Sequence, residues 1–273
     1  FMHSLFDNHP QISTIPGYYM AGFFGPEEWK GIASSDRREM IRRFMEIYDV
    51  VFDAHSPKPL RERRKLGIEE GYNMMGENKD WALSLDREMF SRNLFDLLSG
   101  CDRVSQVDFF KMVHAAFDKT MGHGSAKDLI FYHLHNPTNF ELINYLKQFK
   151  NSKLLLAVRE PLQSCESWMA ACLDEELSYS NLVKQILDCL FKFDQVPYRF
   201  QESRGLRLED IKLDPQQTMA RVCEWLGIEV AKSLFESTFQ GLRWWGEPSS
   251  IRFGRTSPVN GFGLIDDKEG GDP

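Results

Sequence analysis

Apolar and polar positions along the chain alternate in a way that predicts short strands separated by amphipathic helices. Three segments between residues 36 and 117 carry apolar side chains at helical spacing, and the first follows Asp36, a residue that favours helix starts. A further helix is expected after Asp214, with Pro215 at its first position and Gly227 at its end. Four short apolar runs have the composition of strands: residues 11–15, 127–134, 153–158 and 205–208.

This order of elements is typical of an α/β domain in which helices flank a mostly parallel central sheet. We expect one such domain over residues 1–265, with a helical insertion at about 35–121 and a flexible acidic tail at 266–273. The run at 153–158 is predicted to be a buried strand that delivers Arg159 to its carboxyl end, where ligands lie in open α/β sheets. A helix is expected to open after Arg159 and to run to about Leu173.

Composition limits the classes of function. The 273 residues are 42% hydrophobic and 27% charged, as in ordinary globular proteins, and the longest apolar run near the middle is too short to span a membrane. The net charge of −7 disfavours a nucleic-acid partner, because binding to phosphates needs basic surface. Five cysteines without a Cys-x-x-Cys pair disfavour a disulfide framework or a zinc knuckle, and they favour the cytoplasm.

Two basic clusters lie within the predicted helical region. One comprises Arg37, Arg38, Arg42 and Arg43, and the other covers residues 58–65. The simpler interpretation is that they form solvated helix faces. The alternative is a docking surface for an acidic substrate.

Arg159 and Ser167 form the main candidate site. The planar guanidinium of Arg159 suits a phosphate dianion, and Ser167, two turns into the predicted helix, adds a hydroxyl group near a favourable helix dipole. The alternative is that Arg159 pairs with a carboxylate and that Ser167 packs within the helix. The spacing of these two residues does not separate the alternatives.

Motifs at and around Arg159 and Ser167 resemble those of a known protein family. Arg159-Glu-Pro161 followed by Ser167-Trp168 resembles the 3′-phosphate signature of the sulfotransferase superfamily. Residues 1–12, which end in Asp-Asn-His-Pro-Gln-Ile, are similar to the helix after that family's 5′-phosphosulfate loop. The segments 206–211, 214–215 and 225–228 are similar to its Glu-Asp-Leu block and the helix that follows. The resemblance spans residues 1 to about 228 and implies a P-loop-like three-layer fold.

The resemblance also implies a co-substrate, 3′-phosphoadenosine 5′-phosphosulfate (PAPS), and no metal. It implies that Arg159 and Ser167 bind the 3′-phosphate. The stretch 250–258 resembles the family's last nucleotide-binding loop, so Arg255 is implied as a second ligand of this phosphate. The alternative is that residues 250–258 form a surface loop in which the arginines, including Arg255, are exposed.

The segment 132–137, Tyr-His-Leu-His-Asn-Pro, resembles the Lys-x-His-x-Pro motif of the cytosolic sulfotransferases. This implies His135 as the catalytic base, and it puts His133 in the place of the lysine. A histidine suits the role because its ordinary pKa of about 6.5 lies near neutrality. One alternative to a catalytic role is that His133 and His135 are hydrogen-bonded at a strand end. The other is that they bind a metal ion, with His114 or His123 as a third ligand.

The family's 5′-phosphosulfate loop would lie before Phe1, so we expect the chain as given to be incomplete and inactive on its own. The leading prediction is a PAPS-dependent sulfotransferase that acts in line on a hydroxyl of a sugar, lipid or small metabolite. One alternative is a P-loop kinase-like phosphotransferase, which is disfavoured because ATP lacks a 3′-phosphate. The other is a non-catalytic domain that binds a 3′-phosphonucleotide.

Overall fold

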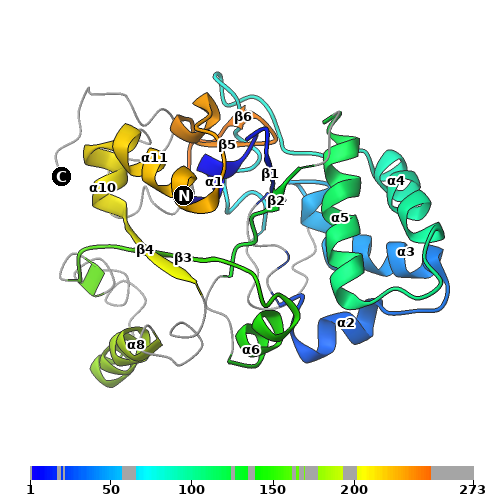
Figure 1. Ribbon diagram of the computed structural model, residues 1–273, viewed down its shortest axis with the longest axis horizontal. Coiled ribbons are helices and arrows are strands. Elements are labelled where there is room, and N and C mark those ends of the chain that lie inside the picture. Colours follow the sequence, from blue (N-terminus) through cyan, green and yellow to red (C-terminus); the bar gives the residue numbers. More distant parts are fainter. Residues whose placement is uncertain are drawn as a thin grey trace.

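The computed structural model describes residues 2–16, 20, 22–56, 66–123, 127–134, 139–161, 164–165, 169, 178–192 and 202–246 (Figure 1). The α-helices of the first half are α1 (Met2–Phe6), α2 (Pro26–Ile32), α3 (Arg37–Ile47), α4 (Arg87–Ser99) and α5 (Gln106–Thr120). Those of the second half are α6 (Asn139–Gln148), α8 (Tyr179–Lys192), α10 (Leu208–Leu213) and α11 (Pro215–Leu226). Two 3₁₀ turns are η1 (Asp49–Val51) and η2 (Lys232–Phe235).

The strands of the described residues form three separate pairs. The parallel pairs are β1 (Ile12–Ser13) with β2 (Leu129–Ile130) and β3 (Leu154–Val158) with β4 (Ser203–Arg207). The antiparallel pair is β5 (Thr238–Phe239) with β6 (Leu242–Arg243). All four predicted strands are present, although β1 and β2 are shorter than predicted and Leu208 opens α10. The α/β class is therefore confirmed, whereas the described strands do not join into the one predicted central sheet.

Local sequence signals set the helix ends. Asp36 caps α3 and Asp214 caps α11, each by accepting a hydrogen bond from a backbone N–H of the first turn. Ser105 and Asp108 form a capping box at the start of α5. Gly227 ends α11 with a φ of 79°, a left-handed conformation that suits glycine. The starts predicted at Asp36 and Asp214 and the end predicted at Gly227 are confirmed.

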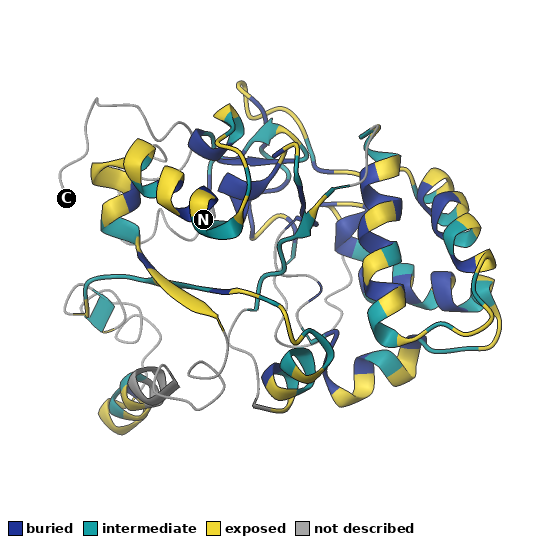
Figure 2. Ribbon diagram, viewed as in Figure 1, coloured by how far each residue is buried: buried dark blue, intermediate teal, exposed yellow. Residues whose placement is uncertain are grey.

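The larger hydrophobic core lies among α2, α3, α4 and α5, whose inward faces are buried (Figure 2). Its aromatic centre includes Phe44, Phe90 and Phe109, so the predicted helical stripes are buried as expected. Phe239 and Trp244 reach this core from the far end of the chain, and the indole N–H of Trp244 donates to the carbonyl of Glu70 at 2.8 Å. Trp244 therefore packs in the core.

A smaller core joins α1 to α10, α11 and η2. Its members are Leu5, Phe6, Ile12, Leu206, Ile211, Met219, Val222, Cys223, Leu234 and Phe235. Residues from the first and last parts of the described chain thus share one core, with α1 beside α11 in Figure 1. The position of α1 depends on this packing because a helix of five residues is not stable alone.

The strand predicted over residues 153–158 is present as β3, but the prediction that it is buried is wrong. Leu154 is buried, Leu155, Leu156 and Val158 are half-buried, and Ala157 is exposed. The reason lies in the pairing, because the described residues give this strand one neighbour, β4, in which Leu206 is the buried residue. A two-stranded sheet has less cover than the centre of a wide sheet.

Asp7, directly after α1, forms hydrogen bonds with residues near both ends of the described chain. Its Oδ1 accepts from the Thr14 hydroxyl at 3.3 Å and from the N–H of Gln240 at 3.2 Å. Its Oδ2 accepts from the Thr238 hydroxyl and the N–H of Gly241, both at 2.8 Å. Burial raises the pKa of Asp7 above its ordinary value, and the four donors act against that rise by favouring the charged form. This carboxylate fixes α1 against the β5–β6 hairpin.

We expect Asp7→Asn to lower the free energy of unfolding by about 2–4 kcal/mol, because an amide NH₂ would face backbone donors that are now satisfied. Denaturant titration measures the change. Asp128→Asn is the matched control: Asp128 accepts one exposed hydrogen bond, from Gln11, and its loss is expected to cost less than about 0.5 kcal/mol. Equal losses in the two variants would contradict the role of Asp7.

Candidate functional site

The candidate phosphate site lies where β3 and β4 end. Val158 is in register with Arg207, so the carboxyl ends of the two parallel strands meet and Arg159 lies at this edge. Arg159 is half-buried, and within the described part of the chain its side chain has no hydrogen bond or ion pair. The carboxylate pairing considered for Arg159 is thus not observed there, and its donors remain for an anion from outside.

Glu209, in the first turn of α10, holds the backbone that follows Arg159. Its Oε1 accepts from the N–H of Glu160 at 2.9 Å. This hydrogen bond is the main cause that lowers the pKa of Glu209; burial opposes it, and the charges of Arg207 and Arg159 add to the lowering. Asp210 instead pairs with Arg207 at 3.1 Å. Both carboxylates therefore act as anchors at the strand ends.

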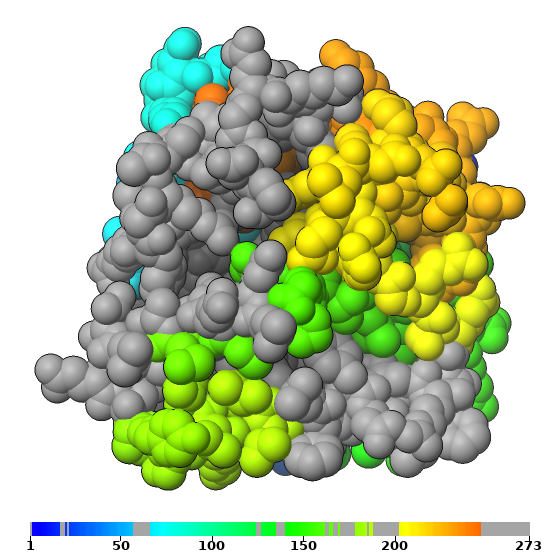
Figure 3. All heavy atoms as spheres, turned by 90° about the vertical axis from the view of Figure 1, so that its left-hand side faces the viewer, coloured from blue at the N-terminus to red at the C-terminus, as the bar shows by residue number. Residues whose placement is uncertain are grey.

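The beginning of the helix predicted after Arg159 is observed, since the N–H of Ser164 donates to the carbonyl of Glu160 at 3.0 Å. Ser167 and Arg255 lie outside the described residues. Their roles as ligands of a 3′-phosphate stay predictions. Figure 3 shows the face of this region, where residues of α8 and α10 lie on either side of residues from the middle of the chain.

The predicted catalytic segment follows β2. His135 lies outside the described residues, whereas His133 is described and half-buried. The ring centroid of His133 lies 6.0 Å from that of His3 in α1, with the rings nearly perpendicular at 76°. A small cavity adjoins both rings and also His114 of α5. Its other lining residues are Ile15, Met20, Phe131 and Tyr132.

His114 is held neutral inside the fold. It is 2% exposed, and its Nδ1 lies 3.0 Å from the hydroxyl oxygen of Ser13 in β1. Burial lowers the pKa of His114 to about 3, and its Nε2 is buried without a hydrogen-bond partner. The sequence indicated His114 only as a possible metal ligand, and His3 was not among the predicted site residues. One feature of the sequence indicates that His114 is buried: it lies within a stripe of apolar helix positions, beside Val113 and Phe117.

The alternative of a metal site gains no support from the described residues. His114 is bonded to Ser13, and His123 pairs with Asp118 at 3.1 Å. In the part of the chain that the structure describes, no three side chains of His, Cys, Asp or Glu gather in a way that would hold a metal ion. His135 itself lies outside that part.

The basic cluster on α3 is largely neutralised by its own helix. Arg42 pairs with Glu39 at 2.7 Å and with Glu46 at 2.6 Å, and Arg43 pairs with Glu39 at 2.8 Å. The hydrogen bonds from Arg42 and then from Arg43 lower the pKa of Glu39 to about 2. Arg37 donates to two backbone carbonyl groups. These contacts favour the solvated helix face.

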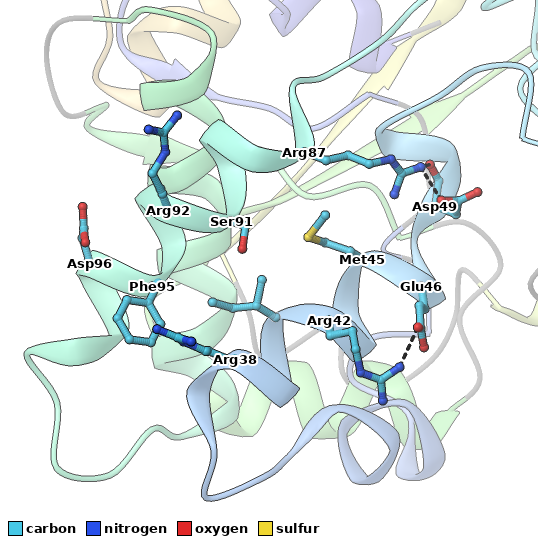
Figure 4. A pocket seen from close by; sticks show the side chains of 11 residues that line it. Arg38, Arg42, Met45, Glu46, Asp49, Arg87, Ser91, Arg92, Phe95 and Asp96 are labelled. Atoms are coloured by element: carbon cyan, nitrogen blue, oxygen red, sulfur yellow. Dashed lines mark hydrogen bonds and ion pairs between the residues drawn. The ribbon is translucent and has the colours of Figure 1, made fainter.

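A groove of about 570 Å³ lies beside this cluster, between α3 and α4 (Figure 4). Arg87 forms an ion pair with Asp49 along it, and Arg38 lies over the ring of Phe95 at 5.4 Å from its centroid. The charges of the groove are therefore mostly engaged within the protein, which does not favour the docking surface. The second basic cluster, at 58–65, lies outside the described residues.

In open α/β sheets, ligands bind at the carboxyl ends of the strands, which is where Arg159 lies. The family model described as the sulfotransferase family matches residues 1–232, and the chain therefore belongs to this family. Among solved structures, the sulfotransferase domain from the curacin biosynthetic pathway is similar, with a TM-score of 0.45 and 16% identity over 87% of this chain and 72% of that one. None of the curated proteins matches. Within the described residues, no helix is long and apolar enough to cross a membrane.

The buried, neutral His114 predicts a pH dependence of stability. Because its pKa is about 3 in the fold and about 6.5 in the unfolded chain, the unfolded state binds more protons between these values. The free energy of unfolding should therefore fall by about 2 kcal/mol between pH 7 and pH 5 on account of this residue. His114→Gln, which does not titrate, should lose less over that interval in denaturant titrations.

The control for this measurement is His55→Gln, because the His55 side chain is 60% exposed. This variant should keep the pH dependence of the wild type. If the free energy of unfolding of His114→Gln depends on pH as that of the wild type does, His114 does not cause the loss of stability between pH 7 and pH 5.

Proposed function

We propose that this sulfotransferase moves a sulfuryl group from PAPS to a hydroxyl of a sugar, lipid or small metabolite. The observation that carries the proposal is the placement of Arg159 directly after β3, half-buried and without an ion pair among the described residues. A guanidinium at such a position donates two parallel hydrogen bonds to a phosphate. The 3′-phosphate of PAPS is the group that suits this donor, and ATP has none.

Arg159 is proposed to share the 3′-phosphate with Ser167 and Arg255. Glu209 supports this arrangement, because it fixes the N–H of Glu160 and with it the turn that carries Arg159. The proposed site requires no metal, since the donors are a guanidinium, a hydroxyl and backbone groups. We also propose a cytoplasmic location, in keeping with the free thiols of the described cysteines Cys101, Cys165 and Cys223.

In the proposed reaction the acceptor oxygen attacks the sulfur atom in line, and the bond from sulfur to the 5′-phosphate oxygen breaks. His135 takes the proton of the acceptor hydroxyl, and adenosine 3′,5′-bisphosphate leaves. Positioning and stabilisation of charge supply most of the rate, and a base adds about 10²–10⁴-fold. His133, two residues earlier, is proposed to act beside His135 as a hydrogen-bond donor to the reacting groups.

Arg159→Ala should weaken binding of adenosine 3′,5′-bisphosphate by about 10–100-fold, the cost of losing charge-assisted hydrogen bonds. Binding of adenosine 5′-monophosphate should not change, because it lacks the 3′-phosphate. Calorimetric titration of both nucleotides measures the difference. Arg204→Ala is the control, since Arg204 is exposed on β4 and lies over Trp225. An equal change for both nucleotides, or none, would refute the role of Arg159.

Two variants of Glu209 separate its hydrogen bond from its charge. Glu209→Ala removes the acceptor of the Glu160 N–H and should weaken bisphosphate binding by about threefold to tenfold. Glu209→Gln keeps an acceptor oxygen and removes a negative charge near Arg159, so it should bind the bisphosphate as tightly as the wild type or more tightly. Calorimetry on both variants tests this. If the two variants bind alike, the hydrogen bond does not position Arg159.

A further inference from the structure

The groove between α3 and α4 has an apolar floor. Ile41 of α3 is 2% exposed, and Met45 and Phe95 pack against the larger core while they also line the groove. Met89, which lies one turn of α4 before Arg92, is 40% exposed. Apolar surface next to a groove and rimmed by polar residues is typical of protein interfaces. The groove therefore offers contact area to a partner.

Two opposite charges at the rim of this groove have no partner in the part of the chain that the structure describes. The side chains of Arg92 and Asp96 are exposed on α4, and neither forms an ion pair or a hydrogen bond there. Figure 4 shows them at the end of the groove away from the Arg87–Asp49 ion pair. The two residues are four positions apart, but an arginine that precedes the acid is the weaker order for a pair within one helix. Each charge is therefore available to a group from outside.

These two charges limit the chemistry of the partner. An acidic ligand is disfavoured because Asp96 lies beside Arg92, and a basic ligand is disfavoured because Arg92 lies beside Asp96. The partner must instead carry both charges, in the reverse order along the groove. The α4 helix of a second copy does so when it runs antiparallel, because Arg92 of each copy then faces Asp96 of the other.

We propose that α4 of a second copy packs antiparallel on α4 over this groove, so that the protein forms a dimer with twofold symmetry. Two Arg92–Asp96 ion pairs, one on each side of the axis, set the register. The same register brings Met89 of each copy against Ser99 of the other, because residues 89 and 99 are symmetric about the midpoint of residues 92 and 96. Ser99 is exposed and small, so it leaves space for the methionine side chain.

The proposed interface leaves the candidate phosphate site open. The α3 and α4 helices lie at one end of the long axis of the molecule, whereas α10 lies toward the other end (Figure 1). The phosphate site adjoins α10, because Glu209 of that helix binds the backbone that follows Arg159. The dimer is therefore compatible with the proposed function and does not depend on it.

Charge reversal in the full-length protein tests the ion pairs. Arg92→Asp or Asp96→Arg alone creates two like-charge contacts in each dimer, because the symmetry repeats every contact. We expect either variant to raise the Kd of the dimer by about 10–100-fold. The double variant restores opposite charges, so its Kd should lie within about threefold of the wild-type value. Sedimentation equilibrium over a concentration series measures these constants.

The matched control is Arg221→Asp, which reverses an exposed arginine on α11, a helix outside the interface. It should keep the wild-type Kd. Three results would overturn the proposal. A wild type that sediments as a monomer up to about 100 µM has no such interface. A dimer that neither single reversal weakens uses another surface. A double variant that is no tighter than the single variants shows that Arg92 and Asp96 do not face each other.

Disulfide formation tests the register. In the double variant Met89→Cys/Ser99→Cys, the two new thiols of one chain lie about 15 Å apart along α4, too far for a disulfide within the chain. Under oxidising conditions this variant should form a covalent dimer on a non-reducing gel. Each single variant should run as the wild type does, since residue 89 faces residue 99. A double variant without the covalent dimer would refute the register.

Discussion

The packing of α1 against the rest of the fold depends on the hydrogen bonds that the buried Asp7 carboxylate accepts. It joins the end of α1 to Thr14 after β1 and to the β5–β6 hairpin, through four hydrogen bonds from residues up to 234 positions away. The smaller core holds α1 on one side, and Phe239 of the hairpin enters the larger core on the other. Asp7 therefore links α1, which belongs to the smaller core, to the hairpin whose Phe239 belongs to the larger core. His3 on α1 is in turn placed beside His133, so the geometry of the cavity follows from this carboxylate.

The described candidate residues Arg159 and His133 lie after strands that take part in parallel pairs. The register of β3 with β4 puts Arg159 next to the start of α10, where Glu209 binds the backbone after it. The pairing of β1 with β2 puts Ser13 close to the segment that carries His133, and Ser13 binds His114. Polar contacts from another element thus hold His114 and the backbone next to Arg159. This arrangement leaves Arg159 without an ion pair within the described residues, as an anion site requires.

Local features of the fold could be predicted from the sequence, and features that depend on distant partners could not. The caps at Asp36 and Asp214 act within one helical turn, so their residue types suffice. The apolar run before Arg159 predicted a strand but not its exposure, because a run does not show how many strands will cover it. The Ser13–His114 contact joins residues 101 positions apart, and the sequence around either residue does not predict it. The positions of Ser167, Arg255 and His135 remain predictions from family motifs.

The central claim is that this sulfotransferase recognises its nucleotide through a 3′-phosphate. The most direct measurement is a calorimetric titration of the wild-type protein with adenosine 3′,5′-bisphosphate and, separately, with ATP. We predict that the bisphosphate binds at least tenfold more tightly, a difference of about 1.4 kcal/mol that charge-assisted hydrogen bonds to its 3′-phosphate supply. Equal binding of the two nucleotides, or binding of ATP alone, would contradict this claim.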